Sequence, residues 1–242
     1  MSVAVAGSGA MARYVCDEFP KYGHAVVILS RSEKECFQNR AKIKQIVTDY
    51  SVHSLTAAID DCDVLISMIL SYTPEFIDVH LNLIKACQMS GRCKRFVPSE
   101  YGTDLENYVD IPLFYYRTRE PILRQALRQQ TDIEWTLVSV GWLVDYIVPQ
   151  GNRYLMDAGE AFPIDLASKK IVIPGTGNDP VDVTAARDLA TALALLVNAP
   201  SWEPYTYISG EKTSWNKLAE LVQQRYHDVI DIAGFARFAF SS

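Results

Sequence analysis

The chain has 242 residues, of which 49% are hydrophobic and 21% are charged, and its formal net charge is −6. This is the composition of an ordinary globular protein, long enough for one large domain or for one domain with a small second lobe. The sequence has no cluster of Lys and Arg and no stretch of 18 apolar residues. We therefore expect neither a nucleic-acid partner nor a membrane span.

The start of the chain, the cysteines and the histidines indicate the cellular setting. Residues 1–5 run directly into a strand pattern without a basic leader, which predicts a cytoplasmic protein without a signal peptide. The five cysteines form no C-x-x-C pair, as is typical of reduced thiols. The four histidines have no ligand spacing, and we therefore expect no metal.

The first 140 residues alternate short apolar runs with helical patterns, which predicts a parallel sheet wound by βαβ units. Six strands in right-handed crossovers are expected. They lie at residues 3–6, 25–29, 45–48, 64–68, 95–97 and 135–140. Helices are expected at residues 11–19, from Ser54, from Pro74 to Gly91, and at residues 117–130.

After Gly141 this regular alternation stops. Residues 142–182 are rich in Gly, Pro and aromatic side chains, with one strand-like run at residues 170–173. Helical patterns at residues 185–197 and 215–226 flank a further strand-like run at residues 205–208. We expect a first domain over residues 1–141 and a small α/β lobe over residues 142–242. The lobe should be interleaved with the first domain and fold over the carboxyl ends of the strands, where such sheets hold their ligands.

Residues 7–12 read G-S-G-A-M-A and match G-x-G-x-x-A between the first strand and the first helix. Gly7 permits the tight turn, Gly9 lets the backbone approach a diphosphate, and Ala12 allows close packing of helix and strand. Free N–H groups and the helix dipole then bind the anion. The pattern predicts a Rossmann-type, doubly wound α/β sheet that binds a dinucleotide, although a purely structural turn is the alternative. The residues expected at the phosphates are Gly7, Ser8, Gly9, Met11 and Ala12.

The end of the second strand distinguishes NADP(H) from NAD(H). An NAD(H) site has Asp or Glu there to bind the ribose 2′-hydroxyl, whereas this chain has Ser30, Arg31 and Ser32, followed by Lys34. Arg31 can pair with a 2′-phosphate in bidentate fashion, so we expect NADP(H). The alternative is that Arg31 and Lys34 only begin a solvated loop. Met68 and Pro98, at the ends of the fourth and fifth strands, are further expected cofactor contacts.

Residues 95–102, R-F-V-P-S-E-Y-G, resemble the R-F-x-P-S-E-[FY]-G motif of the NmrA-like and isoflavone-reductase-like proteins, which are atypical short-chain dehydrogenases. Further similarities lie at residues 30–32, 63–67, 142–146 and 183–188, and the fungal secondary-metabolism branch is the most similar. The resemblance implies NADP(H) binding and the reduction of aromatic or conjugated small molecules. Other members are redox sensors that bind transcription factors without catalysis.

The chain departs from this family in two ways. The reductases carry a proton-handling lysine after the fifth strand, whereas residues 114–121 read F-Y-Y-R-T-R-E-P and no lysine lies between Lys94 and Lys169. Arginine stays protonated at any working pH and cannot replace it as an acid. The family's substrate lobe also normally continues after about residue 226, whereas this chain ends with residues 231–242. We expect Phe235, Phe238 and Phe240 to pack on the small lobe or on a second copy of the chain in a homodimer.

Glu100, Tyr116, Arg117 and Asp145 are the four main candidates for chemistry, and the two carboxylates and the tyrosine each have an alternative role. Glu100 is a candidate base or an acceptor that fixes a loop. Tyr116 and its neighbour Tyr115, near Arg117, are candidate proton donors or aromatic packing residues. Asp145 is a candidate acid or a helix cap.

The expected function is an NADP(H)-binding enzyme that acts on a small aromatic or alkaloid-like molecule, with hydride transfer as the default reaction. Because the lysine is missing, an isomerase or rearrangement enzyme of the same fold is an alternative. A regulatory protein that senses NADP(H) without catalysis is the third interpretation.

Overall fold

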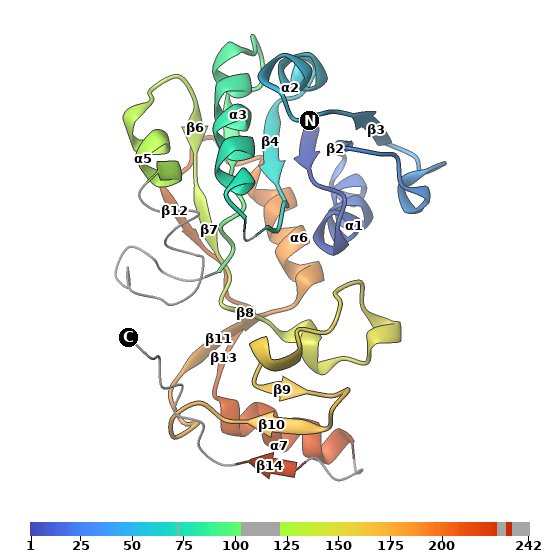
Figure 1. The fold of residues 1–242 in the computed structure, drawn as a ribbon, viewed down its shortest axis with the longest axis vertical. Coiled ribbons are helices and arrows are strands. Elements are labelled where there is room, and N and C mark those ends of the chain that lie inside the picture. Colours follow the sequence, from blue (N-terminus) through green and yellow to red (C-terminus); the bar gives the residue numbers. More distant parts are fainter. Residues whose placement is uncertain (72, 103–121, 227–230, 234–242) are drawn as a thin grey trace. The chain divides into compact units, whose positions relative to one another are not determined.

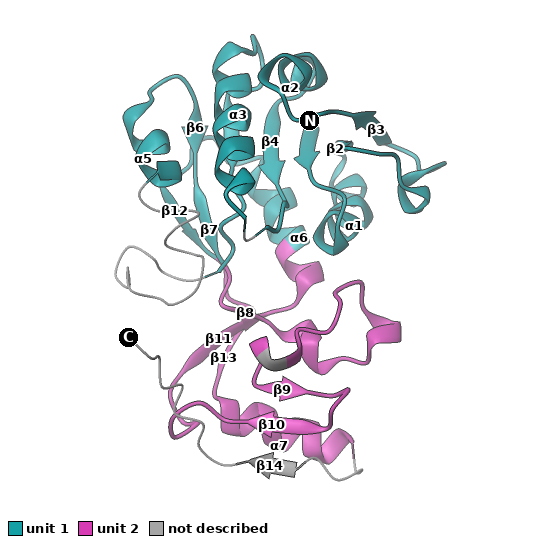
Figure 2. Cartoon of the chain, in the orientation of Figure 1, with its two compact units in different colours: residues 1–139, 190–207 teal, residues 140–189, 208–242 magenta. Residues whose placement is uncertain are grey.

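The computed structural model describes residues 1–71, 73–102, 122–226 and 231–233 (Figure 1). By compactness these residues form two units (Figure 2). Unit 1 comprises residues 1–139 and 190–207, and unit 2 comprises residues 140–189 and 208–242. The sequence predicts a domain boundary between residues 141 and 142, and this boundary remains a prediction. The chain does, however, return to unit 1 for residues 190–207, which we had expected in the small lobe.

Unit 1 is built on a parallel sheet of six strands in the order β3-β2-β1-β4-β5-β6. This is the strand order of a Rossmann-type sheet, so the predicted fold class is confirmed. The strands are β1 (Ser2–Ala6), β2 (Ala25–Ser30), β3 (Ile43–Val47), β4 (Val64–Ser67), β5 (Arg95–Val97) and β6 (Glu134–Trp135).

The helices of unit 1 cover the two faces of this sheet. They are α1 (Ala10–Glu18), α2 (Val52–Ile59), α3 (Glu75–Met89) and α5 (Ile122–Gln129), together with most of α6 (Ala186–Leu196). Helices α2, α3 and α5 pack side by side (Figure 1), whereas right-handed crossovers place α1 on the opposite face. Short 3-10 helices lie at Phe19–Tyr22 and Glu35–Phe37.

The core of unit 1 combines aliphatic side chains with buried phenylalanines such as Phe76 and Phe96. The central strands β1 and β4 are buried along both faces, with Val3, Ala4, Leu65 and Ile66 fully inaccessible to solvent. This burial explains why both strands read as continuous apolar runs and not as alternating patterns. Because these strands are parallel, the carboxyl ends of β1, β2 and β4 lie at one edge of the sheet, next to this buried core.

The last predicted strand of the sheet, residues 135–140, is divided in the structure. β6 pairs with β5, and after Thr136 the chain continues as β7 (Leu137–Ser139), which pairs with β12 (Tyr205–Tyr207). Thr136 is fully buried, and its hydroxyl bonds that of Thr206 at 2.8 Å. The division follows from pairing with a distant strand, so the local apolar run did not reveal it.

Unit 2 contains two small three-stranded sheets, in the orders β13-β11-β8 and β14-β10-β9. Their strands are β8 (Trp142–Leu143), β9 (Ile164–Asp165), β10 (Lys170–Val172), β11 (Val181–Thr184), β13 (Glu211–Thr213) and β14 (Asp231–Ala233). Helix α7 (Trp215–Arg225) begins at the Ser214 cap, and short 3-10 helices lie at Val144–Ile147, Gln150–Asn152 and Gly159–Ala161. Gly141 joins β7 to β8 with a φ of +65°, where a Cβ would overlap the backbone of Asp182.

The core of unit 2 centres on an aromatic cluster of Trp142, Phe162 and Trp215. The three ring centroids lie 5.4 to 5.6 Å apart in edge-to-face arrangements, which are favourable for aromatic pairs. Phe162 and Trp215 are buried in this core, whereas Trp142 is 41% exposed and packs against them from the surface.

Candidate functional site

The turn after β1 has the geometry that the G-x-G-x-x-A motif predicts. Gly7 has a φ of +107°, and a Cβ there would lie 3.1 Å from the backbone of Met68. Its N–H donates to the carbonyl of Leu29 at 2.9 Å. Only glycine combines that φ with so close an approach of two strands. The first glycine therefore fixes the turn between β1 and α1.

Gly9 holds the position where a ligand would approach. It is the N-cap of α1, its φ is −81°, and a Cβ added to it would meet nothing within 4 Å. No side chain caps this helix and no acidic residue lies in its first turn. The first N–H groups of a helix have no intrahelical acceptor and carry the positive end of the dipole. The end of α1 is thus open, positive and supplied with donors, which fits a diphosphate.

Ser8, Met11 and Ala12 are the other predicted residues of this loop. Ala12 is fully buried in the packing of α1 against the sheet. Ser8 and Met11 are half-buried beside Gly9. Their contacts with a phosphate remain a proposal.

The end of β2 presents the basic side chain of Arg31 where an NAD(H) site has Asp or Glu. Ser30 is buried, and its hydroxyl donates to the carbonyl of Ser32 at 2.7 Å, which turns the chain back. Arg31 and Ser32 are exposed. The backbone of Lys34 exchanges two hydrogen bonds with the Gln45 side-chain amide, at 2.8 and 3.1 Å. This loop is therefore ordered, with the Arg31 guanidinium at its start.

A tyrosine that sequence reasoning missed lies beneath Arg31. Tyr50 follows β3, is 7% exposed, and donates its hydroxyl to the Leu29 carbonyl at 2.7 Å. The Arg31 guanidinium carbon lies 5.6 Å from the centre of its ring. Burial raises the pKa of the Tyr50 phenol, while the Gly7 N–H and the Arg31 charge oppose this shift. A single aromatic residue in a loop carries no pattern that sequence reasoning could use.

Glu75 of α3 is an acidic side chain that interacts with Arg31. Glu75 begins α3, and its carboxyl has a lowered pKa, caused first by a hydrogen bond with the Thr73 side chain and also by the Arg31 charge. The Arg31 guanidinium is thus within electrostatic reach of one carboxylate on α3.

The end of β4 closes the floor of the phosphate loop. Met68 is buried and donates its N–H to the Ala6 carbonyl at 2.8 Å. Behind it, the Ser67 hydroxyl bonds Nε2 of the fully buried His80 at 3.0 Å, and His80 Nδ1 bonds the Phe76 carbonyl at 2.8 Å. Because a carbonyl only accepts, Nδ1 carries the proton and Nε2 accepts from Ser67. This pair is therefore structural and holds β4 to α3.

The residues that follow β5 in this motif form hydrogen bonds with the end of β4 and with α5. Pro98 is buried directly after the strand, and the Tyr101 hydroxyl donates to the Ser67 carbonyl at 3.0 Å. Glu100 accepts from Arg124 of α5 at 2.7 and 2.8 Å, with the two side chains 2% and 4% exposed. A buried carboxylate that accepts two hydrogen bonds from one arginine in this way anchors a helix to the end of a strand. The contact favours the anchoring alternative for Glu100, and its predicted role as a base remains a proposal.

The remaining candidate catalytic residues lie elsewhere. Asp145 belongs to unit 2, where its carboxylate accepts the N–H of Ala186 at 2.6 Å and so caps the start of α6. This supports the capping alternative. Tyr116 and Arg117 lie outside the described residues.

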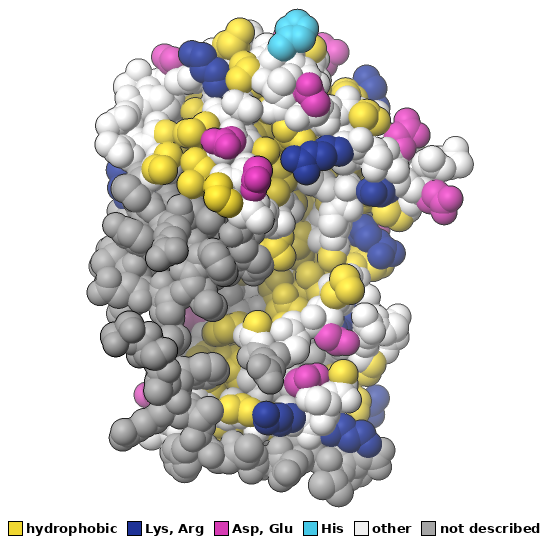
Figure 3. All heavy atoms as spheres, viewed as in Figure 1, with side chains coloured by type: hydrophobic (Ala, Val, Ile, Leu, Met, Phe, Trp, Pro, Cys, Tyr) yellow, Lys and Arg dark blue, Asp and Glu magenta, His cyan; other side chains and the backbone are white. Residues whose placement is uncertain are grey.

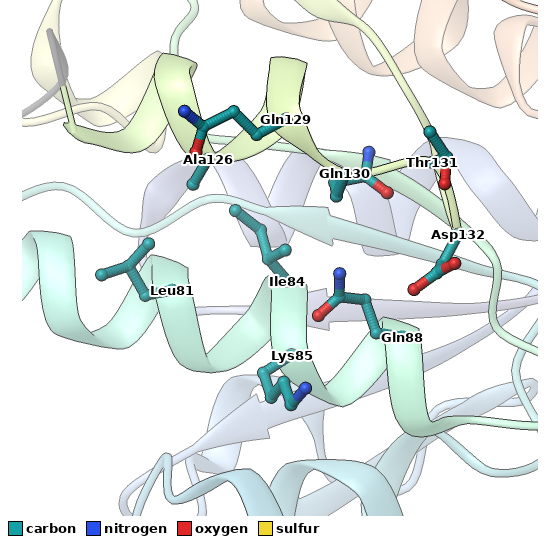
Figure 4. A pocket seen from close by; sticks show the side chains of 9 residues that line it. All are labelled: Leu81, Ile84, Lys85, Gln88, Ala126, Gln129, Gln130, Thr131 and Asp132. Carbon is teal, nitrogen blue, oxygen red and sulfur yellow. The ribbon is translucent and has the colours of Figure 1, made fainter.

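A surface hollow lies between α3 and α5, away from the phosphate loop (Figure 4). It has a volume of about 460 Å³ and is lined mainly by Ile84, Gln88, Ala126 and Gln130. Because α3 runs antiparallel to the strands, its last turns lie at the amino edge of the sheet, opposite the edge that carries Gly9. The hollow is therefore separate from the cofactor site.

On the face in Figure 3, basic and acidic side chains alternate without a patch of one sign. Within the described ranges, no three His, Cys, Asp or Glu side chains are placed to share a metal ion. No helix among the same residues is long and apolar enough to cross a membrane.

A family model described as NAD(P)H-binding matches residues 6–172, which is more than half of the chain. The chain belongs to this NAD(P)H-binding family. The matched segment includes the phosphate loop, the end of β2 and Tyr50. The predicted nicotinamide dinucleotide cofactor is thereby confirmed.

Similar proteins place the chain among oxidoreductase-like members of the family. Oxidoreductase swnR of Metarhizium robertsii is 53% identical over 234 residues, which are 96% of this chain and 76% of that protein. An isoflavone reductase homolog of Nicotiana tabacum is 28% identical and aligns with 81% of this chain and 63% of its own length. The structure of AtPrR2 with NADP+ and (+)pinoresinol has a TM-score of 0.79 at 21% identity, over 98% of this chain and 79% of that one. The predicted resemblance to the isoflavone-reductase-like proteins is confirmed.

Proposed function

We propose that this protein is an oxidoreductase that prefers NADP(H) and transfers a hydride to or from a small aromatic or conjugated molecule. The observation that carries the proposal is the pairing of an open helix N-terminus at Gly9 with a guanidinium at the end of β2. The first feature fits the diphosphate, and the second fits the 2′-phosphate that distinguishes NADP(H) from NAD(H).

The residues of this chain bind and orient the cofactor. When bound, the reduced nicotinamide supplies a hydride from its C4, leaving NADP+, and the reduced substrate needs one proton from an acid. The α1 N–H groups bind the diphosphate, and Gly9 lets them approach it. Arg31, Ser32 and Lys34 bind the ribose phosphate, and Met68 and Pro98 line the strand ends along the cofactor's path.

The proposed reduction requires an acid that donates one proton to the substrate. Glu100 is held by Arg124, and Asp145 caps α6, so both carboxylates already have structural partners. Arg117 stays protonated and can stabilise an oxyanion but cannot deliver a proton. Tyr116 is then the preferred acid among the four candidates.

The substrate class is inferred from similar proteins. The AtPrR2 structure carries NADP+ together with (+)pinoresinol, and the Nicotiana relative is named an isoflavone reductase homolog. These names support a flat, aromatic or conjugated substrate, as the fungal secondary-metabolism resemblance also implies.

A second candidate is a rearrangement without net redox change, favoured by the absence of lysine between Lys94 and Lys169. Conversion of a conjugated substrate with NADPH tests both. Hydride transfer predicts that loss of nicotinamide absorbance equals product formed, mole for mole. Product formed at constant absorbance would contradict hydride transfer and support the rearrangement. Tight NADP(H) binding with no conversion of any such substrate would support a sensor.

The acid is tested by Tyr116→Phe and, as the second candidate, Tyr115→Phe, with Tyr22→Phe at an exposed tyrosine as the control. Loss of a general acid should lower the turnover rate by about 10²–10⁴-fold, with unchanged affinity for NADPH. Normal turnover of Tyr116→Phe would remove Tyr116 as the acid.

A further inference from the structure

Tyr50 links the two parts of the cofactor site that the sequence motifs describe separately. Its hydroxyl donates to the Leu29 carbonyl at 2.7 Å, and the same carbonyl accepts the Gly7 N–H at 2.9 Å. One oxygen of β2 therefore joins the phosphate-loop turn to Tyr50. The ring of Tyr50 then faces the Arg31 guanidinium, whose carbon lies 5.6 Å from the ring centre.

The backbone of Tyr50 is held in an unusual conformation. Its φ is +62°, a left-handed value that is uncommon for a bulky residue and is found where surrounding structure imposes it. The Tyr50 N–H donates to Thr48 Oγ1 at 3.0 Å, and the Tyr50 carbonyl accepts from Asn82 of α3 at 3.1 Å. Thr48 Oγ1 in turn bonds Ser54 of α2 at 2.9 Å. Two helices thus hold the ring in place beneath an exposed arginine.

A ring fixed in this way can hold a flexible cation. Arginine side chains lose rotamer freedom when they bind a ligand, and a guanidinium within about 6 Å of an aromatic face is attracted to it. A guanidinium already resting on a fixed ring has less freedom to lose when it meets a phosphate.

We propose that Tyr50 is a positioning residue that sets the preference for the 2′-phosphate by holding Arg31 over its ring. This inference rests on the proposed role of Arg31 in binding NADP(H). Tyr50 acts on phosphate binding only through Arg31 and does not itself contact the phosphate. The alternative is that Tyr50 only fills the core, in which case its loss lowers stability and leaves cofactor choice unchanged.

The test compares the affinities of the full chain for NADPH and NADH by equilibrium titration. Tyr50→Leu removes the ring, and Tyr50→Asn removes it with a residue that tolerates the left-handed backbone. Tyr50→Phe keeps the ring and removes only the hydroxyl. The probes 2′,5′-ADP and 5′-AMP, which differ only in the 2′-phosphate, give a second ratio free of the nicotinamide. Thermal unfolding identifies any variant that is not folded.

We expect Tyr50→Leu and Tyr50→Asn to lower the NADPH-to-NADH affinity ratio about two- to fivefold, and Tyr50→Phe to leave it unchanged. In an Arg31→Ala background the same ring deletions should leave the ratio unchanged, because the cation on which Tyr50 acts is gone. The matched control Tyr22→Leu, at an exposed tyrosine in another turn, should behave like the unmutated chain.

Three results would overturn the inference. A folded ring-deleted variant with an unchanged ratio would show that Tyr50 only packs the core. An equal effect of ring deletion with and without Arg31 would show that it does not act through that residue. If the unmutated chain binds NADPH and NADH equally, the role of Arg31 fails, and this inference fails with it. The first two results leave the proposed function intact.

Discussion

Gly9 lets a ligand approach the phosphate loop because it has no side chain. Its φ of −81° is open to any residue, and the space beside it is empty of protein atoms. Gly7 is different, because its φ of +107° and the nearby Met68 backbone forbid a side chain on structural grounds. A substitution at Gly9 can therefore separate cofactor binding from folding, whereas one at Gly7 cannot.

We predict that Gly9→Val abolishes binding of NADPH and leaves the midpoint of thermal unfolding nearly unchanged. The branched side chain would occupy the space through which the diphosphate reaches the α1 N–H groups. Gly91→Val is the matched control, because Gly91 also has empty space beside it but follows α3. Titration with NADPH and a melting curve provide the two readouts. Normal binding by Gly9→Val would contradict the assignment of this loop.

At the residue scale, sequence reasoning found the loop but missed its support. Gly7, Gly9 and Arg31 follow from local spacing, since each lies at a fixed offset from a strand end. Tyr50 does not, because its contacts with Leu29 and Asn82 span residues that are 21 and 32 apart in the chain. Such contacts depend on the packing of β3 and α3, which no short motif encodes.

At the scale of elements, the motif at β5 works mainly as a set of anchors. Arg95 donates to Glu134 at 2.5 Å and to the Val197 carbonyl at 2.9 Å, and it lies over the Trp202 ring at 3.9 Å. Glu100 at the other end of the motif binds Arg124. The strand is therefore tied to β6, to the end of α6 and to α5.

We predict that Glu100→Ala lowers the free energy of unfolding by about 3–5 kcal/mol, because it leaves the buried Arg124 charge uncompensated. The double variant Glu100→Leu with Arg124→Met should recover much of this loss. Arg92→Met is the control, since the Arg92 side chain is 57% exposed and its pair with Asp63 should contribute at most about 1 kcal/mol. Urea unfolding measures all three. A Glu100→Ala variant of unchanged stability but without turnover would instead support the catalytic role.

The elements themselves were largely predictable, and their long-range pairing was not. Continuous apolar runs flanked by helical patterns predicted β1, β2, β4 and β5 to within a residue at either end. The run at residues 135–140 was interpreted as one strand, because nothing local shows that Leu137 pairs with Tyr205. Helix α6 was placed by its periodicity, but its return to unit 1 depends on contacts such as that of His24 with the Ala194 carbonyl.

At the scale of the whole molecule, several acidic groups are buried in their protonated form. Burial raises the pKa of Cys16 to about 12 and that of Cys62 to about 11, from an ordinary value of 9.0. Burial also raises the pKa of the Tyr50 and Tyr101 phenols. A group whose pKa is higher in the folded state contributes stability below its unfolded pKa, and this contribution is lost as the pH rises toward its folded pKa.

We therefore predict that the free energy of unfolding falls between pH 9 and pH 11, by at most about 1.4 kcal/mol per pH unit for each buried thiol. Urea unfolding under reducing conditions at pH 8, 9, 10 and 11 measures the slope. Cys62→Ala should reduce the slope, whereas Cys36→Ala, at an exposed cysteine, should leave it unchanged. A slope that is the same in Cys62→Ala as in the unmutated chain would contradict this account.

The central claim concerns the whole site, namely that the chain is built for NADP(H). The most direct measurement is a titration of the unmutated chain and of Arg31→Ala with NADPH and with NADH at one ionic strength. A charge-assisted pair with the 2′-phosphate contributes roughly 1.5–3 kcal/mol, so the unmutated chain should bind NADPH about ten- to a hundredfold more tightly than NADH. Arg31→Ala should lose most of that preference at unchanged thermal stability. Equal affinities of the unmutated chain for the two cofactors would contradict the account.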